Sequence, residues 1–86
     1  MEVKYNCNKD SLTLYVYGEL DEYSASNAKD ALDKVIYDNL NAKKVIFDLE
    51  KVSFMDSAGI GMILGRYKTA QMVGSTLNIT NVKNIW

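Results

Sequence analysis

The chain has 86 residues, enough for one domain near the lower end of the sizes that fold alone. Its 10 Lys and Arg residues almost balance 11 Asp and Glu residues, so the net charge of -1 gives no reason to expect a nucleic-acid or membrane partner. The absence of histidine removes the usual general base and the commonest metal ligand. A single cysteine, Cys7, excludes an internal disulfide. Because no signal peptide and no apolar run of about 20 residues is present, elimination indicates the cytoplasm.

The first half of the chain predicts a β-hairpin followed by a helix. Residues 3–7 alternate apolar and polar, as in a half-buried strand, residues 8–11 favour a turn, and residues 12–17 are dense in β formers. Asp21 matches a helix N-cap, with Glu22 in the first turn. The inward stripe of this helix is expected to be Ala25, Ala28, Leu32, Val35 and Ile36. Its solvated face is expected to be Lys29, Asp30, Asp33, Lys34 and Asp38.

The second half predicts strand, helix and strand. Residues 43–48 form the first of these strands, and residues 52–55 then lead into Asp56 and Ser57. From there apolar residues recur at steps of three and four, the period of a helix on a core: Ile60, Ile63, Leu64 and Tyr67. Gly74 matches the C′ position after a helix, and residues 75–80 form the last strand. The order β-β-α-β-α-β predicts an α/β fold with a mixed sheet and the helices mainly on one face.

Two segments resemble the motifs of a known family. Residues 54–68, FMDSAGIGMILGRYK, are similar to the signature of the bacterial anti-sigma factor antagonists, which are STAS domains. The similarity is greatest to the sporulation branch, the anti-sigma F factor antagonists. Residues 18–21, GELD, resemble the second motif of the family at the expected distance upstream. The likeness extends from about Val3 to Leu77, and it implies one STAS domain over residues 1–86.

The resemblance also implies that the domain is incomplete at its C-terminal side. STAS domains usually continue through a further helix, a short strand and a C-terminal helix. Here the chain stops at residues 81–86, where that helix would begin. Either the chain was shortened or the protein completes its core in another way. Because a missing helix would leave apolar sheet surface exposed, we expect a homodimer or an exchanged element.

Ser57 has three candidate roles at the start of the second helix: cap, nucleophile or phosphate acceptor. Asp56 fits the N-cap better, which would leave the Ser57 hydroxyl turned outward. A nucleophile needs a base, and the chain has no histidine, no Gly-x-Ser-x-Gly elbow and no Ser-x-x-Lys pair at Ser57, so we expect no enzyme activity. A phosphate fits because free amides and the helix dipole favour an anion.

The family resemblance assigns partners to this site. In the anti-sigma factor antagonists, the serine that matches Ser57 is phosphorylated by an anti-sigma factor that is also a serine kinase. The unphosphorylated antagonist binds this kinase and releases the sigma factor, and a serine phosphatase resets it. Relatives often carry a second serine where this chain has Ala58, so Ser57 is the only acceptor in the motif. The partner-binding residues implied are Asp21, Asp56, Ser57, Ala58, Gly59, Gly61 and Gly65. No cofactor or metal is implied. The alternative function is that of a scaffold subunit whose binding does not depend on whether Ser57 is phosphorylated.

The presence of several small residues in the predicted helix after Ser57 requires an explanation. Ala58, Gly61 and Gly65 share one side of the predicted helix, and glycine there costs about 1 kcal/mol relative to alanine. Close helix-on-sheet packing is one explanation, and a smooth strip for a partner's backbone is another; each can hold for different residues. Arg66 and Lys68 are expected on a solvated face, with contact to an acidic patch of a partner as the alternative. The core is expected to take Met55, Met62 and Met72, and an exposed aromatic is expected at Trp86.

Overall fold

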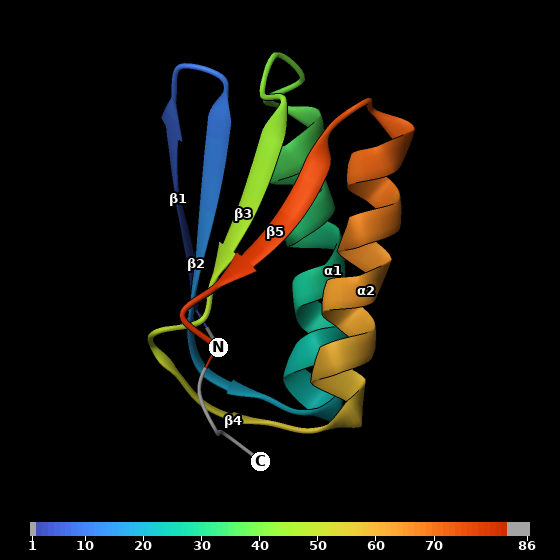
Figure 1. Cartoon of the computed structure of the whole chain (residues 1–86). Coiled ribbons are helices and arrows are strands. Elements are labelled where there is room, and N and C mark those ends of the chain that lie inside the picture. The colour runs from blue at the N-terminus through green and yellow to red at the C-terminus, as the bar shows by residue number, and fades with distance from the viewer. Residues whose placement is uncertain (1, 83–86) are drawn as a thin grey trace.

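A computed structural model describes residues 2–82 and has the predicted α/β architecture (Figure 1). Its elements are β1 (Glu2–Asn8), β2 (Ser11–Leu20), α1 (Glu22–Tyr37), β3 (Lys44–Asp48), β4 (Val52–Met55), α2 (Ser57–Met72) and β5 (Thr76–Thr80). The main sheet has the order β1-β2-β3-β5, in which only β1 runs antiparallel to its neighbour. Both helices lie on the same face of this sheet. The expectation for Trp86 lies outside the described residues.

The strand β4 is an element that the sequence did not predict. It pairs in parallel with the end of β2, so that Gly18 lies opposite Val52 and Leu20 opposite Met55. β2 has ten residues and β3 only five, so the second half of β2 has an unpaired edge for another strand. Four residues are too few to show a strand periodicity, which explains why this pairing was missed.

The core lies between the sheet and the two helices. Alternate residues of β2 are buried, and the inward stripe of α1 is confirmed, although Val35 is only partly buried. Residues that are less than 2% exposed include Leu12, Leu14, Val16, Leu20, Leu32, Ile36, Val45 and Phe47. The expectation of a half-buried first strand is wrong for most of β1. It is an edge strand, and among its residues only Val3, which lies beside α1, is partly buried.

The inward face of α2 differs from the predicted one. Ile63 is buried and Ile60 partly buried, whereas Leu64 is 61% and Tyr67 45% exposed. α2 packs against α1 on one side and lies over the edge strand β5, so its outer side extends past the sheet. Of the methionines expected in the core, Met55 and Met62 are buried and Met72 is exposed.

The solvated face predicted for Arg66 is also wrong. Arg66 is 4% exposed, and its Nε lies 2.7 Å from Oδ1 of Asp33 on α1, which was itself expected on a solvated face. Thr69 Oγ1 donates to the same carboxylate oxygen at 2.9 Å. Met62, Arg66 and Thr69 follow one another at steps of four and three, so they share the side of α2 that packs on α1. A charged group is tolerated in such a position when it is paired.

An exposed apolar surface lies along the outer side of α2 and the adjoining end of β5, whereas the expectation was for exposed apolar surface on the sheet alone. A shallow depression of about 120 Å³ there is lined by Leu49, Met55, Ile60, Ile63, Leu64, Ile79 and Val82. This surface is where a homodimer or exchanged element would have to form, and self-association stays a prediction. No helix within residues 2–82 is both long and apolar enough to cross a bilayer.

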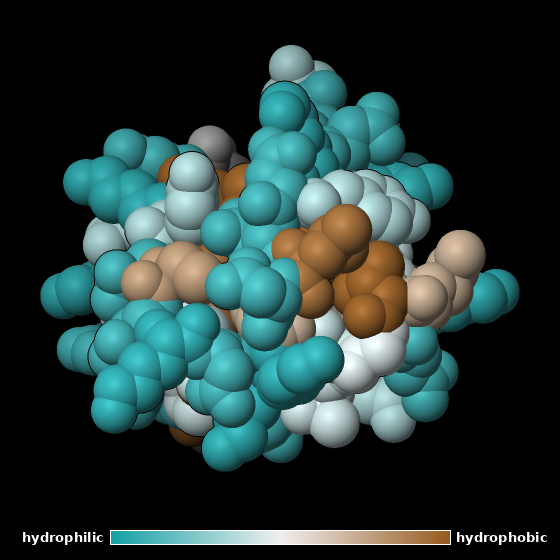
Figure 2. Space-filling model, turned by 90° about the horizontal axis from the view of Figure 1, so that it is seen from above, coloured by the Kyte–Doolittle hydropathy of each residue, from teal (hydrophilic) through white to brown (hydrophobic). Residues whose placement is uncertain are grey.

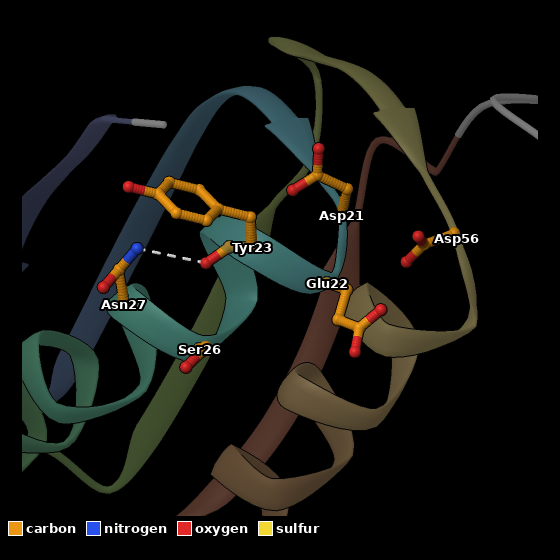
Figure 3. A pocket seen from close by; sticks show the side chains of 6 residues that line it. All are labelled: Asp21, Glu22, Tyr23, Ser26, Asn27 and Asp56. Atoms are coloured by element: carbon orange, nitrogen blue, oxygen red, sulfur yellow. Dashed lines mark hydrogen bonds between the residues drawn. The ribbon is translucent and has the colours of Figure 1, made fainter.

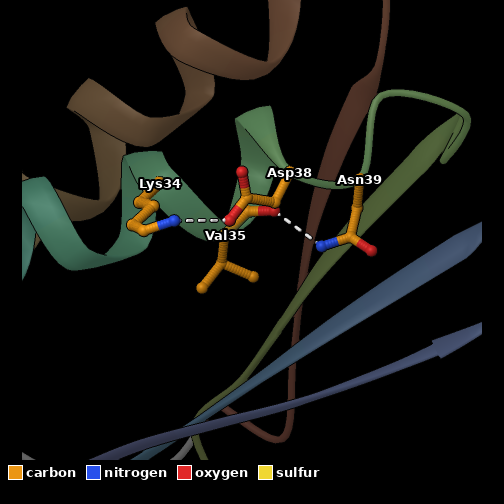
Figure 4. Close-up of polar contacts among 4 residues, drawn as sticks. All are labelled: Lys34, Val35, Asp38 and Asn39. Carbon is orange, nitrogen blue, oxygen red and sulfur yellow. Dashed lines mark hydrogen bonds and ion pairs between the residues drawn. The ribbon is translucent and has the colours of Figure 1, made fainter.

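The end of the molecule that carries the C-terminus of α1 is mostly hydrophilic, with a small hydrophobic cluster (Figure 2). Lys34 Nζ lies 2.8 Å from Asp38 Oδ2, and Asn39 Nδ2 donates to the Val35 carbonyl at 2.7 Å (Figure 4). The hydrogen bond to Asp38 raises the pKa of Lys34. Both side chains of this ion pair are exposed, so its effect on stability is small.

Candidate functional site

The parallel pairing of β2 and β4 brings the two motif segments together. Leu20 and Met55 are paired in register, and the Asp56 amide donates to the Leu20 carbonyl at 3.3 Å. The next residue of each strand is an aspartate, Asp21 or Asp56, and each aspartate is the N-cap of the helix that follows. The N-termini of α1 and α2 therefore lie side by side, and Asp21 lies beside the same surface as the second motif, as the family resemblance implied.

Asp56 caps α2 and leaves Ser57 outside the cap. Its Oδ1 accepts from the amides of Ala58 at 3.0 Å and Gly59 at 3.1 Å. Ser57 is the first helical residue and is exposed. We expected free backbone amides that could bind an anion. This expectation is wrong for the amides of Ala58 and Gly59, because both already donate to the Asp56 carboxylate.

Asp21 caps α1 through reciprocal bonds with Ser24. The Asp21 carboxylate accepts from the Ser24 amide at 2.9 Å and from the Ser24 hydroxyl at 3.0 Å, and the Asp21 amide donates to Ser24 Oγ at 2.9 Å. These bonds favour the ionised carboxylate, and the backbone bond from Ser24, followed by its side-chain bond, lowers the pKa of Asp21.

The lowered pKa of Asp21 predicts an acid-dependent loss of stability. The stabilisation is complete above the unfolded-state pKa, at about pH 4, and is lost as the pH falls through the lower folded-state pKa. Below about pH 4 we expect the free energy of unfolding to fall more steeply for wild type than for Asp21→Asn, which keeps an acceptor oxygen but does not titrate. Urea denaturation at a series of pH values measures this. Asp30→Asn on the exposed face of α1 is the control, and equal slopes for Asp21→Asn and wild type would contradict the prediction.

An acidic depression of about 590 Å³ lies where the two helices begin (Figure 3). Its lining consists of Asp21, Glu22, Tyr23, Ser26, Asn27 and Asp56. The Tyr23 side chain is 80% exposed, and Asn27 Nδ2 donates to the Tyr23 carbonyl at 3.1 Å. Three carboxylates beside an exposed aromatic suit a partner surface that is basic and partly apolar. Tyr23 was not predicted here, although an aromatic residue opposite the apolar stripe of α1 was a usable signal.

A second hollow, the interhelix groove, runs between α1 and α2 with a volume of about 360 Å³. From α1 its lining takes Glu22, Ala25, Ser26 and Lys29, and from α2 it takes Ala58, Gly61, Met62, Gly65 and Arg66. Glu22 and Ser26 line the acidic depression as well, so the two hollows adjoin at these two residues.

The three glycines of α2 have different environments. A Cβ on Gly59 would lie 2.5 Å from the Leu20 carbonyl oxygen, so close packing explains this glycine. A Cβ on Gly61 or Gly65 would meet nothing within 4 Å, so packing within the described chain requires neither of them. Gly59 is buried beneath the surface, whereas the other implied partner-binding residues all retain exposed area: Asp21, Asp56, Ser57, Ala58, Gly61 and Gly65.

The site has the groups for binding and for modification of a hydroxyl, and it lacks a base next to Ser57. Asp56 is engaged in two amide bonds, and the chain has no histidine. Within residues 2–82 there is no group of three or more histidine, cysteine or acidic side chains that could hold a metal ion.

Comparisons with known proteins agree with this architecture. The family model of the STAS domain matches residues 2–85. An anti-sigma F factor antagonist of Paenibacillus polymyxa is 27% identical over 95% of this chain and 69% of its own length. An anti-sigma-B factor antagonist of Listeria monocytogenes is 35% identical over 79% of this chain and 58% of its own. The chain thus spans between 58% and 69% of the length of these relatives.

Solved structures share the fold. The anti-sigma factor antagonist SpoIIAA in its unphosphorylated form has a TM-score of 0.73 at 23% identity, over 95% of this chain and 74% of that chain. Its phosphorylated form has a TM-score of 0.70 at 24% identity, over 96% and 75%. The fold can therefore be assigned from the structure as well as from the sequence.

Proposed function

This chain belongs to the STAS domain family, and because its relatives include anti-sigma factor antagonists, we propose that it is an antagonist switched by phosphorylation of Ser57. The unphosphorylated form binds an anti-sigma factor that is also a serine kinase, and this binding releases the sigma factor. Phosphorylation of Ser57 by that kinase ends the interaction, and a serine phosphatase restores it. The chain itself carries no catalytic activity, and the exchange takes place in the cytoplasm.

The observation that carries this proposal is the exposed Ser57 at the first position of a helix whose cap is another residue. Because Asp56 accepts hydrogen bonds from the amides of Ala58 and Gly59, the Ser57 hydroxyl is not needed to cap the helix. A kinase can reach this hydroxyl without unfolding α2. Further support comes from SpoIIAA, a structure of the same fold solved in both an unphosphorylated and a phosphorylated form.

The surroundings of Ser57 explain how a phosphate would act. A phosphate adds about −1.5 to −2 charges and three oxygens. Asp21, Glu22 and Asp56 already place carboxylates around the adjoining depression. A partner matched to the unmodified surface would have to bury additional, unpaired negative charge, which costs several kcal/mol.

Intact-mass spectrometry after incubation with the cognate kinase and ATP tests the proposal. We expect the wild type to gain the mass of one phosphate and Ser57→Ala to gain none. Ser53→Ala, which removes another exposed serine four residues earlier, is the matched control and should gain one. Phosphate on the Ser57→Ala protein, or none on a wild type that binds the kinase, would rule out Ser57 as the switch.

A further inference from the structure

We propose that Arg66 is a positioning residue for Ser57. Its buried contact with Asp33 fixes the rotation of α2 about its own axis, and this rotation sets the direction in which the Ser57 hydroxyl faces a partner. The inference rests on the proposed function, because the partner is the anti-sigma kinase. It assigns a role to a charged group that the phosphorylation switch does not itself use.

The contact joins the two helices at one carboxylate oxygen. Asp33 Oδ1 on α1 lies 2.7 Å from Arg66 Nε and accepts the Thr69 hydroxyl at 2.9 Å. Arg66 and Thr69 are three residues apart, so they are neighbours on one side of α2. Among residues 2–82, no other side-chain hydrogen bond or ion pair joins α1 to α2. Two points on α2 are therefore held to one point on α1.

The energetics of this buried pair argue against a purely stabilising role. Arg66 is 4% exposed, and neither its Nε nor its Nη1 has an acceptor in hydrogen-bonding geometry within the described chain. Buried donors without acceptors cost free energy, and a buried ion pair is often no more stable than apolar residues of similar volume. A pair of this kind calls for an explanation other than stability.

The remaining contacts of α2 restrict its rotation only weakly. The interhelix groove separates α1 from α2 over about 360 Å³. A Cβ at Gly61 or Gly65 in this groove would meet nothing within 4 Å, so no atom of α1 lies against α2 at these two positions. Elsewhere α2 is held by the burial of apolar residues such as Ile63 and Ala70. Apolar burial has no preferred direction, whereas a hydrogen bond depends on its angle.

A rotation of α2 would displace the Ser57 hydroxyl. α2 is one continuous helix from Ser57 to Met72, so a rotation at Arg66 is transmitted to Ser57, nine residues earlier. A rotation of about 10° moves a side-chain atom that lies about 5 Å from the helix axis by about 1 Å. A displacement of this size at a reacting group lowers a rate by up to about a hundredfold.

Kinase assays on an apolar replacement of the pair test this role. The double variant Asp33→Leu/Arg66→Met removes both charges together, so neither partner is left unpaired. We expect its free energy of unfolding, measured with urea, to equal or exceed that of the wild type. The kcat/KM for phosphate transfer to Ser57 should nevertheless fall by about tenfold or more. Arg66→Lys keeps a cation opposite Asp33, and its kcat/KM should lie between those of the double variant and the wild type.

The control removes the same two kinds of charge from an exposed site. Lys34→Met/Asp38→Leu deletes the ion pair of α1 in which both side chains are exposed. Its kcat/KM should stay within about twofold of wild type.

Amide NMR spectra of the free proteins supply a readout that does not depend on the kinase. The backbone resonances of Ser57 and Ala58 should move in the double variant, because the start of α2 turns relative to the Asp56 cap. In the control, which leaves the contact between the helices intact, they should stay in place.

The outcomes separate this inference from the proposed function. If the double variant is phosphorylated as well as the wild type, Arg66 does not position Ser57 and the antagonist function stands. If its rate falls while the Ser57 and Ala58 resonances stay in place, the effect is not one of position and the inference is again excluded. A double variant that does not fold would show that the pair serves the fold, which also overturns the inference. If the kinase does not phosphorylate the wild type, the proposed function fails and this inference fails with it.

Discussion

The protein phosphorylated on Ser57 is expected to bind its anti-sigma partner about a hundredfold more weakly than the unmodified protein, a penalty of about 3 kcal/mol. Ser57 is exposed and directly follows Asp56, which lines the depression at the helix N-termini together with Asp21 and Glu22, so a phosphate adds to an end of the molecule that is already anionic. The amides of Ala58 and Gly59, which could have compensated the added charge, are bonded to Asp56. Charge repulsion and the loss of hydration of the phosphate therefore both weaken binding when a partner covers the site.

Titration calorimetry on the phosphorylated protein, on Ser57→Asp and on Ser57→Ala measures this effect. Ser57→Asp carries less charge than a phosphate and should show a smaller loss in the same direction, while Ser57→Ala should bind as the wild type does. Ser53→Asp is the matched control for an added charge on a nearby exposed serine. Equal affinity of the phosphorylated and unmodified proteins would instead favour the scaffold alternative, in which binding ignores the state of Ser57.

Local features of the sequence were enough to predict four of the five strands, both helices and both N-caps. Asp21 and Asp56 are short polar residues directly before a helical pattern, and the structure places both as N-caps. Gly74 was expected after the second helix because it tolerates a left-handed backbone, and its φ is 80°. Each of these assignments depends on residues within one or two turns of the position concerned.

The features that were missed depend on pairings between distant segments. β4 is a strand because the end of β2 offers it an edge, and four residues cannot signal that on their own. Arg66 is buried because α1 covers its side of α2. A pattern search that counts only apolar residues does not recognise that Met62, Arg66 and Thr69 form one buried face. Likewise Leu64 fits the helical period but extends past the sheet edge.

The same limit applies to the site. The sequence singled out Ser57 and the small residues after it, since they form a continuous motif. It did not predict the wall contributed by α1, where Glu22, Tyr23 and Lys29 lie beside those residues. Their positions follow only from the parallel pairing of β2 with β4, which sets the two helix N-termini next to each other.

Alanine substitutions at two glycines of α2 are expected to change stability in opposite directions. Gly59→Ala would put a methyl group 2.5 Å from the Leu20 carbonyl oxygen and 2.8 Å from Met55 Cγ. The carbonyl belongs to the backbone at the end of β2 and cannot move away without disturbing its pairing with β4. We expect the free energy of unfolding to fall by about 2 kcal/mol or more. Gly61→Ala meets nothing within 4 Å and gains helix propensity, so it should raise that free energy by up to about 1 kcal/mol.

Urea denaturation of the two variants and the wild type measures this contrast directly, because the chemical change is the same and the positions are two residues apart on one helix. Gly65→Ala serves as the second open position and should follow Gly61→Ala. A stabilised Gly61→Ala protein that also binds its partner more weakly would show that this glycine serves the contact and not the fold. Destabilisation of Gly61→Ala comparable to that of Gly59→Ala would mean that the groove is filled within the chain itself, and the open surface described for α2 would have to be abandoned.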